Sequence, residues 1–225
     1  ISAVTAGTSN FVAGSNAGDS ITSGGNNNTL IGDNAGTTIT TASNNTAVGS
    51  RAMIANTSGA ENTAVGEQAL TVNTTGANNT AIGKAALLLN TTASYNTVVG
   101  SSAMYNNTTG SNNVAVGFQS LQQNTTAYQN TAVGTTALKS TTTGLDNTGV
   151  GFSAMFANTT GYNNTAVGKS SLAANTTGAQ NTSVGKNALA ANTTASYNTA
   201  VGNESLKTNT TGASNTAVGW YSLFS

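Results

Sequence analysis

The side chains best suited to chemistry are few in this sequence and do not gather. It contains no histidine and no cysteine, so the commonest general base, thiol nucleophile and soft metal ligands are missing. Glu61 and Glu67 lie close together, but the paired carboxylates of a glycoside hydrolase would have to come from different segments. We therefore expect a protein that is not an enzyme and has no catalytic residues. Its acidic residues are Asp19, Asp33, Glu61, Glu67, Asp146 and Glu204.

Cofactor and metal sites are also unsupported by the sequence. Asp19 and Asp33 fall at similar places in two irregular segments, where carboxylates of neighbouring segments are the ligand type that calcium prefers. Solvated loop residues are the simpler interpretation, so we expect no metal. The recurring Gly-x-x-Ala pattern lacks the Lys-Ser/Thr of a phosphate-binding loop. No cofactor is expected.

Aromatic residues form the second group of candidates, because exposed rings can stack on sugars or on a neighbouring chain. Near the end of the sequence Trp220, Tyr221 and Phe224 crowd together, which suggests a cap or a junction. With Phe118 and Phe152, they are the candidate assembly or ligand contacts. Packing between coils or protomers is the simpler interpretation for all of them. A further set of tyrosines lies just before a recurring asparagine: Tyr95, Tyr128, Tyr162 and Tyr197.

The composition excludes several classes of partner. The formal net charge is zero and only 5% of residues are charged, so a basic stripe for nucleic acid and a polybasic membrane patch are both absent. No apolar run approaches the length of a membrane-spanning helix, and Ile1-Ser2-Ala3-Val4-Thr5-Ala6 does not read as a signal peptide. We expect neither nucleic-acid binding nor membrane insertion.

The elements that position these residues follow from one repeat. Asn45-Thr46-Ala47-Val48-Gly49 recurs every 17 residues to the end of the sequence. A fixed short period of this kind indicates a stacked architecture. We number each repeat from its asparagine as position one. The position-one asparagines are expected to form one hydrogen-bonded ladder along the stack: Asn45, Asn62, Asn79, Asn96, Asn113, Asn130, Asn147, Asn164, Asn181, Asn198 and Asn215.

The apolar positions predict a thin core inside each repeat. Position four is always β-branched, position five is always glycine, and position nine is leucine or methionine. Thr-Ala-Val favours extended structure, and runs of four to six residues are too short for stable helices. The expected core is formed by position four meeting position nine: Val48, Val65, Ile82, Val99 and Val116 with Leu70, Leu87 and Leu121.

Each repeat is expected to be one coil of an all-β, parallel β-solenoid (β-roll). The expected path is a strand, a turn at Gly49, a second strand around Ala52-Met53, and a turn over residues 56–59. A second asparagine ladder is expected at position twelve. Residues 1–27 are expected to form an irregular coil or cap, with one residue inserted, and residues 28–225 the repeat domain.

One coil buries little apolar surface, so a second buried face is expected to stabilise it. Position three supplies a stripe of small residues on the opposite side of the strand from the valines, such as Ala47, Ala64 and Ala81. We therefore expect a closed homo-oligomer packed through this stripe, with a homotrimer as the leading candidate. Unpaired ends also make head-to-tail stacking into a filament possible.

The Asn-Thr-Ala-Val-Gly-x-x-Ala-Leu motif resembles the repeats of two kinds of surface protein. One is the left-handed parallel β-roll head of trimeric autotransporter adhesins. The other, closer, is the Asn-Thr-Ala-Val-Gly…Asn-Thr-Thr-Gly repeat of phage-type tail-fibre proteins, which often precedes an endosialidase-type intramolecular chaperone domain. The resemblance covers about residues 28–225. It implies a trimeric fibre on a cell surface or virion, extracellular, that binds a host or a matrix.

The leading hypothesis is a non-enzymatic structural fibre or filament shaft that serves attachment. Two alternatives stay open: an adhesin module that binds a host-surface glycan, and an ice-binding solenoid with regular outward threonines. The Asn-Thr-Thr triplets are also formal N-glycosylation sequons, which would carry glycans at a ring of turns in a secreted eukaryotic or archaeal protein. They begin at Asn73, Asn90, Asn124, Asn158, Asn175, Asn192 and Asn209.

Overall fold

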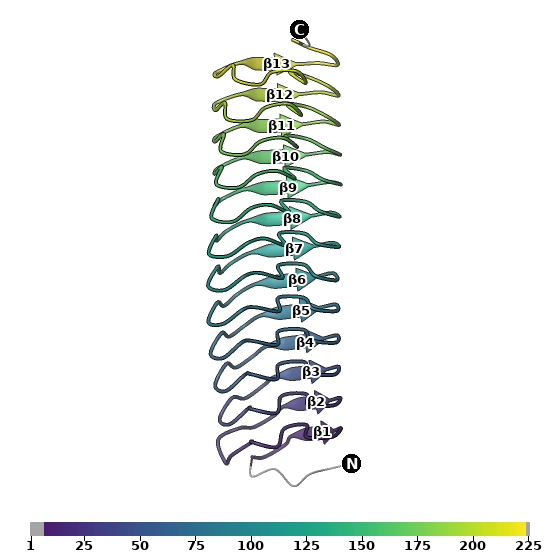
Figure 1. The fold of residues 1–225 in the computed structure, drawn as a ribbon, viewed down its shortest axis with the longest axis vertical. Coiled ribbons are helices and arrows are strands. Elements are labelled where there is room, and N and C mark those ends of the chain that lie inside the picture. The colour runs from purple at the N-terminus through teal and green to yellow at the C-terminus, as the bar shows by residue number, and fades with distance from the viewer. Residues whose placement is uncertain (1–6, 224–225) are drawn as a thin grey trace. The chain divides into compact units, whose positions relative to one another are not determined.

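The computed structural model describes residues 7–223, which divide into two compact units between residues 112 and 113. Each unit is a parallel β-solenoid with one three-residue strand per coil, stacked in chain order (Figure 1). The first unit contains β1 (Phe11–Ala13), β2 (Thr29–Ile31), β3 (Thr46–Val48), β4 (Thr63–Val65), β5 (Thr80–Ile82) and β6 (Thr97–Val99). The second contains β7 (Val114–Val116), β8 (Thr131–Val133), β9 (Thr148–Val150), β10 (Thr165–Val167), β11 (Thr182–Val184), β12 (Thr199–Val201) and β13 (Thr216–Val218).

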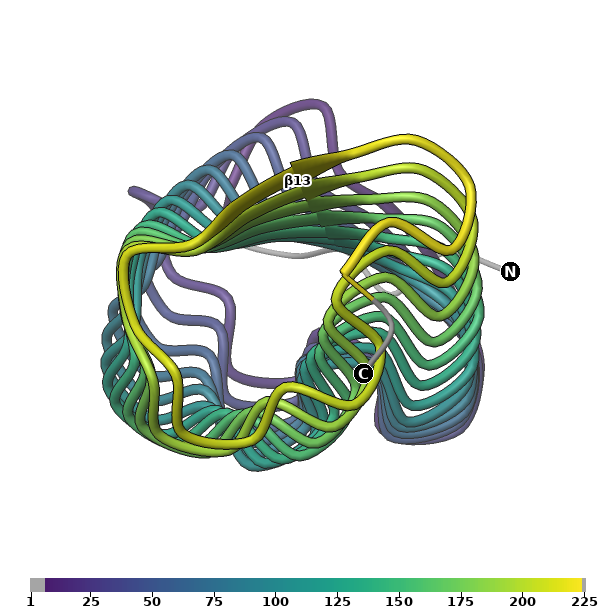
Figure 2. The same ribbon diagram turned by 90° about the horizontal axis from the view of Figure 1, so that it is seen from above.

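The strands pair in register, so equivalent positions lie over one another. Thr46 pairs with Thr63 in the first unit, and Thr148 pairs with Thr165 in the second. Seen along the stack, the strands of a unit lie on one side of the coil (Figure 2). The predicted insertion is confirmed, because Phe11 of β1 pairs with Thr29, one residue further on than the usual spacing. The described part of the expected cap, residues 7–27, therefore contributes a strand to the same sheet.

Glycine at position five ends every strand for a steric reason. Gly49 has a φ of 134°, a backbone conformation that L side chains rarely adopt. A Cβ there would lie 2.6 Å from the carbonyl carbon and oxygen of Gly66 in the next coil. The stack thus excludes any side chain at this place.

The second strand predicted around Ala52-Met53 is wrong. Arg51 and Met53 both have positive φ, 59° and 51°, which is incompatible with a strand. The same alternation recurs at positions seven and nine of the later coils. Hydrogen bonds between coils hold this segment, for example from the Met53 N–H to the Ala69 carbonyl at 3.0 Å. The backbone therefore turns tightly here, with the residues at positions seven and nine in the left-handed region. Each of these residues carries a conformational cost, because left-handed backbone is unfavourable for residues other than glycine.

The expected ladder at position one is confirmed within each unit. The backbone N–H and side-chain amide of Asn164 both donate to Asn147 Oδ1, at 3.0 and 3.2 Å. Asn147 Nδ2 in turn donates to Asn130 Oδ1 at 3.2 Å and to the Gly161 carbonyl at 2.8 Å. These amides are buried, so the ladder satisfies polar groups that water cannot reach.

Position twelve carries the second ladder, which is also confirmed. Asn90 Nδ2 donates to Asn73 Oδ1 at 2.8 Å and to the Ala93 carbonyl at 3.0 Å. Where Thr141 replaces asparagine, Asn158 Nδ2 donates a long hydrogen bond of 3.5 Å to the threonine hydroxyl. The bond from Asn209 Nδ2 to Asn192 Oδ1 is also 3.5 Å long, so the ladder tolerates weak rungs.

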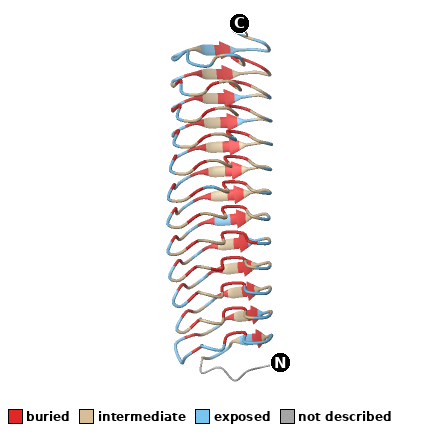
Figure 3. Cartoon of the chain, in the orientation of Figure 1, coloured by how far each residue is buried: buried red, intermediate tan, exposed pale blue. Residues whose placement is uncertain are grey.

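The predicted core is right at position nine and wrong at position four. Leu70, Leu87 and Leu121 are fully buried. Position three, not position four, faces them: the middle residue of every strand from β1 to β13 is buried, and the residues on either side of it are half-buried or exposed (Figure 3). The misassigned residues lie outside, half-buried except for Ile82, which is exposed: Val48, Val65, Ile82, Val99 and Val116.

The interior of the coil is narrow at position three, which holds alanine in most coils. At Gly149 of β9, an added Cβ would lie 3.1 Å from Leu138 Cγ, so a side chain there would require Leu138 to shift. The small-residue stripe, including Ala47, Ala64 and Ala81, is therefore the inner wall of the coil and not a surface. The expectation that a second chain packs against this stripe is wrong.

Because position nine is buried and position four is not, truncating their side chains to alanine is expected to lower the free energy of unfolding by different amounts. Leu138→Ala is expected to lower the free energy of unfolding by about 2–5 kcal/mol, because it leaves a cavity in a tightly packed interior. Val133→Ala in β8 is expected to cost at most about 1 kcal/mol in the unassembled chain, because Val133 is already partly exposed. Denaturant unfolding of both variants provides the measurement, and equal costs would contradict the assignment.

Candidate functional site

The described residues offer surfaces rather than a cleft. Residues 7–223 form no pocket, and no group of three or more acidic residues among them could hold a metal ion. Over the same range no helix is long and apolar enough to cross a membrane. The acidic candidates are dispersed: Glu67 forms an exposed ion pair with Lys84 at 3.0 Å, and Asp33 accepts a hydrogen bond from Asn34 at 2.8 Å. The candidate site must therefore be sought among the ranks of repeated side chains.

The outer side of the sheet is the most regular of these surfaces. In each coil from β2 onward, positions two and four point outward, and we call these side chains the Thr–Val face. Position two is threonine except at Val114, and position four is valine or isoleucine, so no charged residue lies on this face. In four successive coils of the second unit it comprises Thr131, Val133, Thr148, Val150, Thr165, Val167, Thr182 and Val184.

The threonine hydroxyls of this face make no hydrogen bond within the described chain. The threonines at position thirteen behave differently, since Thr74 Oγ1 donates to the Thr91 carbonyl at 3.0 Å and Thr159 Oγ1 to the Thr176 carbonyl at 3.0 Å. The position-thirteen hydroxyls therefore tie neighbouring coils together. The hydroxyls of the Thr–Val face remain available, beside a rank of β-branched methyl groups, to something outside the chain.

The predicted aromatic candidates lie on the surface but do not form one site. Phe118 and Phe152 are each about half exposed, and Lys169 Nζ lies 5.7 Å from the centroid of the Phe152 ring. Trp220 is 73% exposed and packs edge-on against Tyr221, with their ring centroids 4.6 Å apart. Phe224 lies outside the described residues. The structure therefore brings Trp220 and Tyr221 together and leaves the two phenylalanines apart from them.

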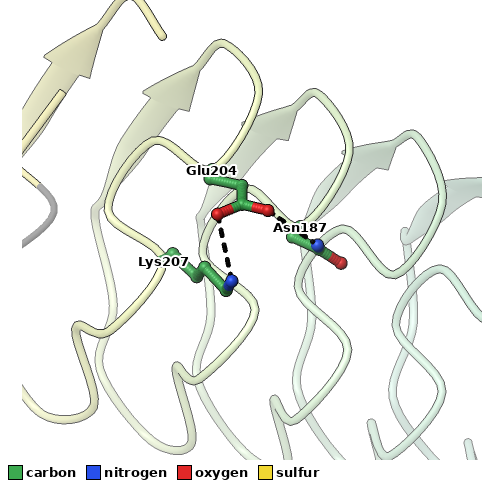
Figure 4. Close-up of polar contacts among 3 residues, drawn as sticks. All are labelled: Asn187, Glu204 and Lys207. Carbon is green, nitrogen blue, oxygen red and sulfur yellow. Dashed lines mark hydrogen bonds and ion pairs between the residues drawn. The ribbon is translucent and has the colours of Figure 1, made fainter. Parts of the chain in front are cut away.

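Tyr221 belongs to a polar cluster that sequence reasoning missed. Glu204 is only 8% exposed and accepts hydrogen bonds from Lys207 at 3.0 Å and Asn187 at 3.3 Å (Figure 4). Hydrogen bonds from Lys207 and then from Tyr221 lower the pKa of Glu204, and the bond to Glu204 raises the pKa of Tyr221. The cluster joins three successive coils. The sequence feature that could have indicated this cluster is the presence of oppositely charged residues three positions apart, Glu204 and Lys207.

Glu204→Gln is expected to reduce the loss of stability in acid. Because the folded pKa of Glu204 is lowered, its contribution is present above the unfolded pKa and is lost as pH falls through the folded value. The variant should therefore show a shallower fall in unfolding free energy from neutral pH down to about pH 3. Glu67→Gln, which removes an exposed pair, is the control and should leave the slope unchanged. An unchanged slope in Glu204→Gln would contradict the cluster's role.

The Asn-Thr-Thr sequons are not a ring of glycosylation sites. Asn73, Asn90 and Asn175 are fully buried, and each side-chain nitrogen is used in the position-twelve ladder. A glycan on any of them would break that ladder. Glycans attached at these buried asparagines are therefore incompatible with the folded coil.

Comparison with known proteins found no match: no protein-family model matches the sequence, and neither a curated protein nor a solved structure matches it. The class is therefore defined by the structure alone. It is an all-β parallel β-solenoid repeat protein, and each unit has two internal asparagine ladders and an uncharged outer sheet face.

Proposed function

We propose that this chain is a non-enzymatic structural protein that forms the shaft of a fibre or filament on a cell or virion surface and serves attachment. The observation that carries the proposal is the Thr–Val face, which is repeated, in register and free of charge. A regular apolar rank that stays partly exposed on a folded chain is typical of a surface that another protein covers.

The occupant of this face in the proposal is another copy of the same chain, in a closed homo-oligomer. A homotrimer agrees with the resemblance to tail-fibre and adhesin repeats. Each strand contributes only two outward side chains, so the interface has to extend along many coils. Like-charge repulsion does not oppose the approach of two copies, because neither positions two nor four carry charge.

Sedimentation equilibrium of the purified chain over a range of concentrations tests this proposal. We expect a discrete mass of three chains that persists at micromolar concentration. A stable monomer at that concentration would contradict assembly through the Thr–Val face. An extracellular location is part of the same proposal and follows from the attachment role.

Ice binding is a second candidate, favoured by the unbonded hydroxyls of the Thr–Val face. Threonine hydroxyls and valine methyls alternate there at the sheet's own spacings, about 4.8 Å between coils and about 6.6 Å between positions two and four. Such an array can order water into a lattice. Thermal hysteresis of a monomeric preparation is expected under this candidate, and a chain that is trimeric and shows no hysteresis would exclude it.

A further inference from the structure

A second surface lies in the second unit, at the two positions that precede the position-one asparagine. Position sixteen holds Tyr128, Leu145 and Tyr162 in three successive coils, and position seventeen holds Gln129, Asp146 and Asn163. We call these six residues the Tyr–amide face. Tyr128 and Tyr162 are 44% and 45% exposed, and the three position-seventeen residues are all exposed.

The backbone holds the Tyr–amide face in a fixed arrangement. The Asp146 N–H donates to the Tyr128 carbonyl at 3.3 Å, and the Asn163 N–H donates to the Leu145 carbonyl at 3.1 Å. Gln129, Asp146 and Asn163 have φ of 58°, 56° and 53°, so the chain turns in the same way in each coil. The rings therefore stand over one another two coils apart, at a separation of about 9.6 Å.

The rings and hydroxyls of Tyr128 and Tyr162 make no polar or ring contact with the rest of the described chain. Neither Tyr128 nor Tyr162 has a ring partner, a cation over its face or a hydrogen bond to its hydroxyl among the described residues. The two phenylalanines at position six are also two coils apart, but Lys169 lies over Phe152 and no row of amides adjoins them. The Tyr–amide face thus combines two aromatic platforms at the same position of the coil with the side-chain amides of Gln129 and Asn163.

We propose that the Tyr–amide face binds a neutral linear polysaccharide. Pyranose rings present flat C–H faces that stack on tyrosine, and the separation of the two rings is close to the length of a disaccharide unit. The amides of Gln129 and Asn163 supply donors and acceptors for sugar hydroxyls. Asp146 is the only charged residue of the face and no cation adjoins it in these positions, so an anionic glycan is disfavoured. This site deepens the proposed attachment role by naming its ligand class.

Isothermal titration calorimetry with neutral β-1,4-linked hexasaccharides of glucose, xylose, mannose and N-acetylglucosamine tests the proposal on the full chain. We expect at least one to bind, the matching disaccharide to bind much more weakly, and Tyr128→Ala and Tyr162→Ala each to weaken binding about tenfold or more. Alanine is acceptable to the fold here, because Ala60 and Ala77 occupy the same position in other coils.

Phe118→Ala is the control, since Phe118 is an aromatic residue of the same unit that is 50% exposed but follows its strand at position six, whereas the Tyr–amide face precedes the strands. It should bind as the wild type does. Failure of every hexasaccharide to bind, or equal losses in Phe118→Ala and Tyr162→Ala, would overturn the proposal. Sedimentation of the same samples separates the two proposals, because the Tyr variants should keep the wild-type mass whatever their affinity for sugar.

Discussion

Val150→Glu is expected to leave the chain folded and to convert the proposed oligomer into monomers. Val150 lies on the outer side of β9, between Val133 and Val167 of the flanking strands. In a closed oligomer each copy brings the same residue to the interface, so the new carboxylates would be buried without a partner. An uncompensated buried charge costs about 3–5 kcal/mol, which weakens association at least about 100-fold. Sedimentation equilibrium measures the change.

Thr143→Glu is the control, because it adds the same negative charge at another place on the surface of the same unit. Thr143 is exposed at position fourteen of the same unit, away from the Thr–Val face. It should keep the wild-type mass. If Val150→Glu also kept that mass, the face would not be the interface; if both variants became monomeric, general charge repulsion would be the cause.

Asn147→Asp is expected to give the largest loss of fold stability from a change of so few atoms. The new carboxylate would place oxygen in the position of Asn147 Nδ2, which donates to Asn130 Oδ1 and to the Gly161 carbonyl. Acceptors would then face acceptors in a site with no access to water. We expect a loss of about 3–5 kcal/mol at neutral pH.

The pH dependence of that variant provides a second readout. Burial beside two acceptors raises the pKa of the new carboxyl, so the loss is full above the folded pKa and shrinks as pH falls through it. Asn163→Asp is the control, because position seventeen is exposed and holds Asp146 one coil earlier. It should change the unfolding free energy by less than about 0.5 kcal/mol. Similar losses in both variants would contradict the ladder's role.

The sequence was sufficient to predict the stacking, the two ladders and the burial of position nine. These follow from periodicity, since identical asparagines at a fixed spacing have few other ways to be satisfied inside a protein. Gly49 likewise marked the end of its strand, because a glycine that recurs in every repeat indicates a conformation closed to other residues. None of these inferences depended on how side chains alternate between the two sides of a strand.

The direction of the side chains was where sequence reasoning failed. A strand of three residues carries little alternation, and the larger residue, valine, was assigned to the core. The interior is filled by leucine or methionine at position nine, and at Gly149 even a methyl group would lie 3.1 Å from Leu138 Cγ, so Leu138 would have to shift. The recurring small residue at position three was therefore the signal of a narrow interior. The left-handed backbone conformation at positions such as Met53 could not be predicted from the sequence, because leucine and methionine do not favour that conformation.

The candidate sites were predicted less well than the fold. Phe118, Phe152 and Trp220 are exposed, which agrees with a role in contacts, but within the chain Lys169 lies over the Phe152 ring and Tyr221 packs against Trp220. The Thr–Val face could not be recognised while valine was assigned to the interior. Composition identified threonine as abundant, yet only the structure distinguishes hydroxyls that join coils from hydroxyls that face outward, as Thr74 and Thr148 illustrate.

The most direct test of the proposed assembly is the reactivity of single cysteines, which the absence of native cysteine makes unambiguous. Thr148→Cys places a thiol on the Thr–Val face, and Thr143→Cys places one on the exposed position fourteen of the preceding coil. The rate of modification by a small water-soluble thiol reagent is measured on each native assembly. We predict slow modification at residue 148 and fast modification at residue 143; equal, fast rates at both residues would contradict burial of this face between copies of the chain.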